Sequence, residues 1–154
     1  PDFTFSAHAI EVAVDTETGE ITVLKSVGCH DVGQAINPTA VEGQIQGGSA
    51  QGIGWALMEE VKVREGVTQT PSYSEYLIPT AKDLPKTEAI ILESGTGVGP
   101  FGAKGIGEPS LTPAAPAVAN AVADAIGVRI HDLPITPEKV LEALGRKRET
   151  GAGA

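Results

Sequence analysis

A glycine-rich stretch in the first half of the chain, INPTAVEGQIQGGSAQGIGWALMEEV, constrains the fold most, because glycine disfavours the helix that its apolar spacing predicts. Asn37 is a good N-cap and Pro38 suits the first helical position, so the sequence predicts a helix over residues 38–60. Each glycine costs an exposed helix about 1 kcal/mol relative to alanine, and tertiary packing must compensate. The stretch therefore indicates either tight helix–strand packing or the close approach of a bound cofactor. Its glycines are Gly43, Gly47, Gly48, Gly52 and Gly54.

The segments around this helix predict a mixed α+β fold. Two β-rich runs joined by DTETGE predict an antiparallel hairpin over residues 7–29. A short exposed strand with a Gly66 turn is expected within 61–71, and another strand at 88–94. These elements place β-structure on both sides of the long helix in the sequence.

Two further helices are expected near the C-terminus, over residues 111–127 and within 132–145. Residues 146–154 are expected to be a disordered tail, which makes 1–145 the folded part of a larger domain. The expected boundary residues are Thr112, Pro113 and Gly127 for the first helix, and Thr136, Pro137 and Gly145 for the second.

The composition excludes several classes of partner. The net charge is −9, with 20 acidic and 11 basic residues, whereas a nucleic-acid binder needs a basic surface. No run of 18 apolar residues occurs, so no membrane span is expected. The single cysteine, Cys29, can form no intramolecular disulfide and cannot by itself ligate an iron–sulfur cluster, which fits a cytoplasmic setting. Because the chain begins at Pro1 without methionine, it is expected to be processed or part of a longer protein.

Most familiar catalytic patterns are absent. Lys104 is followed by Gly105, so the glycine-rich segment GAKGIGEPSL does not match a phosphate-binding P-loop. The histidines lack metal-ligand spacing and are expected to be structural or exposed. Ser49 lies outside the G-x-S-x-G pattern of a nucleophile, and Cys29 has no base nearby in the sequence. The three histidines are His8, His30 and His131.

Glu108, at the end of GAKGIGEP, allows two interpretations. It lies four residues before Thr112, where a negative charge stabilises a helix N-terminus by about 0.3–1 kcal/mol. Alternatively, the glycine-rich loop presents this carboxylate in a partly dry cleft, where a raised pKa suits it to act as a base.

Three segments in consistent order carry a resemblance to a known family: CHDVGQAINPTAVEGQIQGGSAQGIGWALMEE, YLIPTAKDLP and GPFGAKGIGEPSLTPAAPAVANAVADAIGVRIHDLPITPEKVL. Over about residues 5–145 the chain resembles the C-terminal part of the molybdenum-binding subunit of the xanthine dehydrogenase and aldehyde oxidoreductase family. The resemblance implies part of a larger molybdopterin-binding domain of an oxidoreductase. That enzyme would hydroxylate an aldehyde or an N-heterocycle, of the xanthine or nicotinate type, with water as the oxygen source.

The resemblance also implies roles for individual residues. Glu108 corresponds to the family glutamate that acts as base on the hydroxide bound to molybdenum. Gln44 is similar to the glutamine whose amide reaches the cofactor near the metal, where it adds no charge. The cofactor-binding loop implied by the resemblance consists of Lys104, Gly105, Ile106 and Gly107.

Most cofactor and substrate contacts of the family lie in segments that this chain lacks. The resemblance therefore implies a chain that is inactive alone, as a fragment or a split subunit, and that needs the rest of the molybdenum-binding subunit. It further implies a molybdenum-pterin cofactor in its cytosine dinucleotide form, and partner subunits or domains that carry iron–sulfur clusters and FAD. The alternative is a non-catalytic assembly or binding module of the same fold.

Overall fold

The computed structural model describes residues 2–151, with side chains described as far as Gly145. The chain begins with the expected antiparallel hairpin, in which β1 (Ser6–Val14) pairs with β2 (Ile21–Asp31). The turn between them is held by Asp15, whose carboxylate accepts hydrogen bonds from the backbone amides of Glu17 and Thr18. The predicted hairpin is confirmed.

A third strand, β5 (Thr87–Leu92), pairs in parallel with β2, so the sheet order is β1-β2-β5. The strand itself was expected, but its parallel partner was not. Parallel strands need a long crossover connection, and here the crossover contains the long helix α1 (Pro38–Leu57). The central strand therefore lies between one neighbour close in the sequence and one far from it.

The glycine-rich helix α1 forms where the sequence predicts it. The Asn37 side chain accepts a hydrogen bond from the Ala40 amide at 3.1 Å, which confirms the N-cap. The helix ends at Leu57, three residues before the expected end. The amides of Met58 and Glu59 both donate to the carbonyl of Gly54, which closes the last turn.

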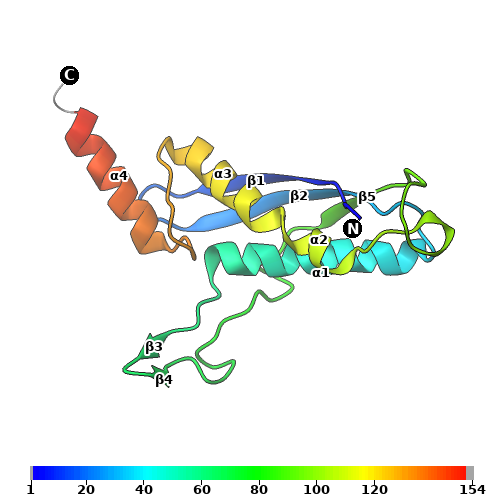
Figure 1. Cartoon of the computed structure of the whole chain (residues 1–154). Coiled ribbons are helices and arrows are strands. Elements are labelled where there is room, and N and C mark those ends of the chain that lie inside the picture. Colours follow the sequence, from blue (N-terminus) through cyan, green and yellow to red (C-terminus); the bar gives the residue numbers. More distant parts are fainter. Residues whose placement is uncertain (1, 152–154) are drawn as a thin grey trace.

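Helices cover one face of the sheet, as Figure 1 shows, with α1 along the sheet and α3 (Ala114–Ile126) beside β1. The main core lies between these helices and the hairpin, and a smaller one lies near the end of β2. The smaller core consists of Val32, Val41 and Ile45, against which Ala35, Ala89, Ile91 and Ile106 pack. The mixed α+β architecture is confirmed.

Residues 59–80 form an arm that projects from this body (Figure 1). Two short strands, β3 (Val63–Arg64) and β4 (Val67–Thr68), pair around Gly66, in agreement with the predicted turn. At its base, the Tyr76 hydroxyl donates a hydrogen bond to the Glu59 carboxylate at 2.6 Å. The exposed residues of the arm contribute little to the core.

The C-terminal helices differ from prediction at their boundaries. An additional short helix, α2 (Gly107–Leu111), precedes α3, which begins at Ala114 rather than near Leu111. The expected N-cap role of Thr112 is wrong. Because α2 forms, Thr112 caps its C-terminal end and its hydroxyl donates to the carbonyl of Glu108. Gly127 ends α3 in the left-handed conformation, as expected.

The last helix, α4 (Pro137–Gly151), begins where predicted, and the Lys139 amide donates to the Thr136 hydroxyl. Gly145 does not end it, because a single glycine weakens a helix without stopping it. Of the expected disordered tail, the backbone of residues 146–151 continues α4, whereas residues 152–154 lie outside the described residues. Across residues 2–151, no helix combines the length and the apolar character that crossing a membrane requires.

Candidate functional site

Glu108 lies in the first turn of α2, after the glycine-rich loop. Its side chain is exposed, and among the described residues its carboxylate has no hydrogen-bond or ion-pair partner. Pro109 follows it within the first turn, where the missing N–H of proline does no harm. The carboxylate is therefore presented to solvent on a short rigid element rather than on a free loop.

Ser110 fixes the orientation of α2. Its side chain is 1% exposed, and its hydroxyl donates a hydrogen bond to the carbonyl of Gly107 at 2.6 Å. Side chains two residues apart in a helix lie about 200° apart around its axis. Because Ser110 packs against α1, Glu108 points away from α1.

Gln44 lies on α1 one turn before Gly48, the residue that contacts Ser110. Its side chain is exposed and, within the part of the chain that the structure describes, makes no hydrogen bond. No interaction joins Gln44 directly to Glu108. The two side chains flank the contact between α1 and α2 without touching.

The glycines of α1 have different surroundings, and a β-carbon on Gly54 would collide with Glu59 and Pro79 after the end of the helix. A β-carbon on Gly48 or Gly52 would collide with α2 or the start of α3, so these glycines serve helix–helix packing instead of the expected helix–strand packing. A β-carbon on Gly43 or Gly47, beside Gln44, would meet nothing within 4 Å. Internal packing therefore gives no reason for glycine at these two positions.

The loop before α2 combines a buried cation with open backbone. The Lys104 ammonium lies 2.6 Å from the Asp31 carboxylate, and the two side chains are 4% and 11% exposed. Ile106 packs against the smaller core. A β-carbon on Gly105 or Gly107 would meet nothing within 4 Å, so the main chain there is accessible to a neighbouring molecule.

Asp31, at the end of β2, is a site residue that the sequence did not reveal. Besides Lys104, its carboxylate accepts hydrogen bonds from the amides of Gly33 and Ser94, at 2.9 and 3.4 Å. The Lys104 ammonium, with the Gly33 amide and Ser94, holds the pKa of Asp31 well below its usual range. Asp31 and Lys104 are 73 residues apart, so no local spacing pattern could have linked them.

The three histidines differ in burial. His30 is fully buried, and His8 is partly buried with its Nε2 3.0 Å from the Ser26 hydroxyl. Burial lowers the pKa of both, and the charge of His30 lowers that of His8 further. His131 is exposed. Among residues 2–145, whose side chains are described, no three or more His, Cys, Asp or Glu form a cluster able to hold a metal ion.

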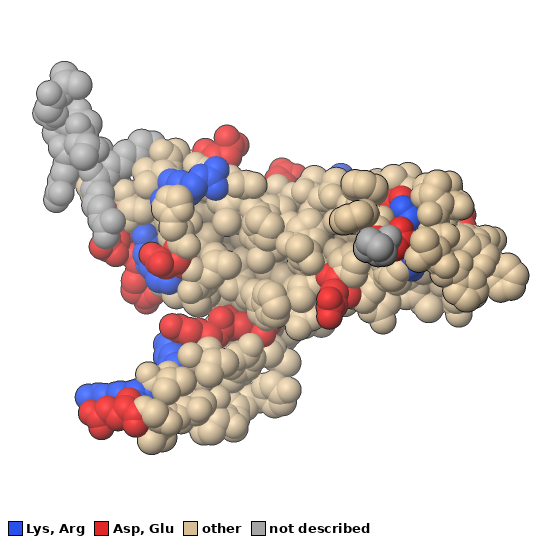
Figure 2. Space-filling model, in the orientation of Figure 1, with Lys and Arg blue, Asp and Glu red and all other residues tan. Residues whose placement is uncertain are grey.

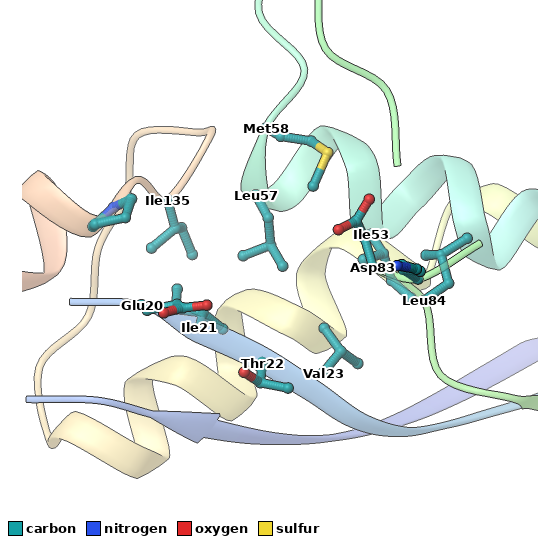
Figure 3. Close-up of a pocket in the computed structure, with 12 residues that line it drawn as sticks. Glu20, Ile21, Thr22, Val23, Ile53, Leu57, Met58, Asp83, Leu84 and Ile135 are labelled. Atoms are coloured by element: carbon teal, nitrogen blue, oxygen red, sulfur yellow. The ribbon is translucent and has the colours of Figure 1, made fainter. Parts of the chain in front are cut away.

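A cleft of about 360 Å³ lies away from all these groups, at the C-terminal end of α1. Figure 3 shows Ile21, Leu57 and Ile135 around it. Neither Glu108 nor Gln44 lines it. On the face drawn in Figure 2, charged side chains gather near the arm and the start of α4, and the middle of this face is largely uncharged. The candidate site is thus an open surface rather than an enclosed pocket.

Comparison with known proteins identifies relatives. Residues 1–85 match the family model described as "Molybdopterin cofactor-binding domain". The putative xanthine dehydrogenase molybdenum-binding subunit XdhA of Escherichia coli is 38% identical over 140 residues, which cover 90% of this chain. The chain spans about a fifth of the length of that relative, 19%.

Solved structures of similar fold include two oxidoreductases. Quinoline 2-oxidoreductase from Pseudomonas putida 86 superposes with a TM-score of 0.84 at 40% identity, over 90% of this chain and 18% of the other. Aldehyde oxidoreductase from Desulfovibrio gigas has the same TM-score and identity, over 92% of this chain and 15% of the other.

Proposed function

Since the chain belongs to the molybdopterin cofactor-binding domain family of the molybdenum-binding subunits of xanthine dehydrogenases and aldehyde oxidoreductases, we propose that it forms the part of such a subunit that supplies the catalytic base. The reaction is the hydroxylation of an aldehyde or N-heterocycle with oxygen from water. The named relatives include enzymes of both substrate types, which supports this range.

The exposed groups around the α1–α2 contact fit a bound cofactor. Gly43 and Gly47 on α1, and Gly105 and Gly107 beside α2, leave backbone that no part of the described chain covers. Main chain without side chains lets a large flat ligand approach at all four glycines, and the amides of Gly105 and Gly107, which lie outside the helix α1, can donate to its phosphate and pterin acceptors. When bound, the molybdenum cofactor supplies the centre that takes two electrons from the substrate.

Glu108, Gln44 and the loop 104–107 take different roles around the bound cofactor. Glu108, unpaired and exposed, accepts the proton that the water-derived oxygen loses as it attacks the substrate carbon. Gln44 orients the cofactor through its amide, which can donate and accept without adding charge. The main chain of Lys104, Gly105, Ile106 and Gly107 would lie along the bound cofactor.

The complete enzyme needs polypeptide beyond this chain. We assign most cofactor contacts to the rest of the molybdenum-binding subunit, because the relatives are about five times longer than the matched segment. The proposal includes the cytosine dinucleotide form of the cofactor, partner subunits or domains with iron–sulfur clusters and FAD, and a cytoplasmic location. The chain alone is expected to be inactive.

The free carboxylate of Glu108 carries this proposal, and replacing it is the direct test. In the assembled enzyme, Glu108→Gln is expected to lower kcat at least 100-fold while the molybdenum content stays near normal, since general-base catalysis contributes roughly 10²–10⁴-fold. Glu88→Gln, at an exposed position of β5, is the matched control and should keep full activity. Substantial activity in the Glu108→Gln enzyme would instead support a non-catalytic assembly module.

A further inference from the structure

The ion pair between Lys104 and Asp31 is buried, and both of its charged groups have further contacts that a surface salt bridge lacks. Besides the Asp31 carboxylate, the Lys104 ammonium faces the Phe5 ring, with 5.6 Å to its centroid. Asp31 in turn is held by the amides of Gly33 and Ser94. The charged end of Lys104 is thus enclosed by the protein and turned away from solvent.

Stability alone does not explain this pair. Removing two charges from water costs about as much as their attraction returns, and well-packed apolar residues often serve equally well. The backbone here is already tied, because the Lys104 amide donates to the Val32 carbonyl at 2.8 Å and the Gly95 amide donates to the Gly33 carbonyl at 2.8 Å. The ion pair instead fixes the position of the Lys104 side chain. This side chain stands at one end of the loop that leads to Glu108.

Only three residues separate Lys104 from Glu108, and two of them are glycines. Gly105 and Gly107 have open surroundings and great backbone freedom, so the loop needs anchors on both sides. Beyond Glu108, the anchor is Ser110, buried against α1. Before it, the anchors are Lys104 and Ile106, supported by the Thr4 hydroxyl, which donates to the Gly105 carbonyl at 3.1 Å.

We propose that Asp31 and Lys104 form a positioning pair that holds the loop 104–107 and thereby places the carboxylate of Glu108. Lys104 acts through its buried ammonium, which leaves only its main chain available to face a bound cofactor. The catalytic consequence of placing the Glu108 carboxylate rests on the proposed function. The ordering of the loop by the pair is a property of the chain itself and can be measured without the cofactor.

The first test is hydrogen exchange on the 154-residue chain. In Lys104→Met, the hydrogen-bonded amides of residues 104 and 112, which lie on either side of the loop and α2, are expected to exchange at least tenfold faster, whereas those of β1 and α3 keep their rates. The double variant Asp31→Leu/Lys104→Met, which leaves no unpaired buried charge, should fold and show the same local effect. Lys139→Met is the matched control: its ammonium bonds the Asp132 and Pro134 carbonyls, so its effect should stay near residues 132–136.

Two outcomes would overturn the positioning role: unchanged exchange at residues 104 and 112 in both variants, or an equal rise throughout the chain. In the assembled enzyme, Lys104→Met should lower kcat roughly 100-fold with KM and molybdenum content unchanged, as expected for a misplaced catalytic group. An active Glu108→Gln enzyme would remove the proposed function but leave the exchange result standing. The two proposals can therefore fail separately.

Discussion

Gly48 of α1 lies so close to Ser110 of α2 that a β-carbon at position 48 would stand 2.7 Å from the Ser110 carbonyl carbon. A backbone atom cannot rotate aside as the end of a side chain can. Because Gly48 has no side chain, α1 and α2 can approach this closely. Their separation in turn sets the position of Glu108 relative to Gln44.

We expect Gly48→Ala to destabilise the chain by about 1–3 kcal/mol, because α2 must shift to admit the new methyl group. Gly47→Ala is the matched control, since its β-carbon would meet nothing within 4 Å. That variant should gain up to about 1 kcal/mol from the higher helix propensity of alanine. Urea denaturation of both variants measures the difference, and equal stabilities would contradict the packing assigned to Gly48.

A second prediction concerns pH. The imidazole of His30 is fully buried, and neither of its ring nitrogens has a hydrogen-bond partner among the described residues. Burial lowers the pKa of His30 and of His8 below the ordinary value of 6.5, so the folded chain binds these protons less readily than the unfolded chain. The free energy of unfolding should therefore be greatest above that value and fall as the pH drops below it.

Denaturation at about pH 7.5 and pH 5.5 measures this effect. Because burial is the larger cause for both histidines, the difference should persist in high salt, which screens charge–charge repulsion. His30→Met should reduce the difference. If that variant kept the full pH dependence, His30 would not be its source.

The arm should be the first part of the chain to be cut by a protease. Residues 60–69 are all exposed, and the only secondary structure there is the short pair β3 and β4. Limited trypsin digestion is expected to cleave first after Lys62 or Arg64 and to spare Lys104, whose side chain is buried. Mass spectrometry of the early fragments checks this, and initial cleavage at Lys104 would contradict the buried ion pair.

The local elements of this fold could be predicted because neighbouring residues determine them. The DTETGE turn indicates the hairpin, and Asn37 with Pro38 gives the start of α1. The short helix α2 was missed because its five residues carry too little periodicity, so Thr112 was assigned to the wrong helix. Capping residues identify a boundary only when the adjoining helix is recognised.

The site was predictable only in part, for a different physical reason. Glu108 was singled out from the glycine-rich loop before it and Gln44 from the resemblance to a family, and both roles stay predictions, whereas Asp31 is an ordinary residue at the end of a strand. Its role depends on the parallel pairing of β2 with β5 and on a lysine far along the chain. Such long-range partners leave no local pattern in a single sequence.

The parallel pairing also determines when the site forms during synthesis. The hairpin and α1 can form from neighbouring residues as the nascent chain leaves the ribosome, but β5 and Lys104 emerge only after the whole arm. Closing so long a loop is a slow, late step of folding. Until then β2 has an unpaired edge and Asp31 lacks its counter-ion, so the emerging protein exposes both an open strand and an unpaired carboxylate.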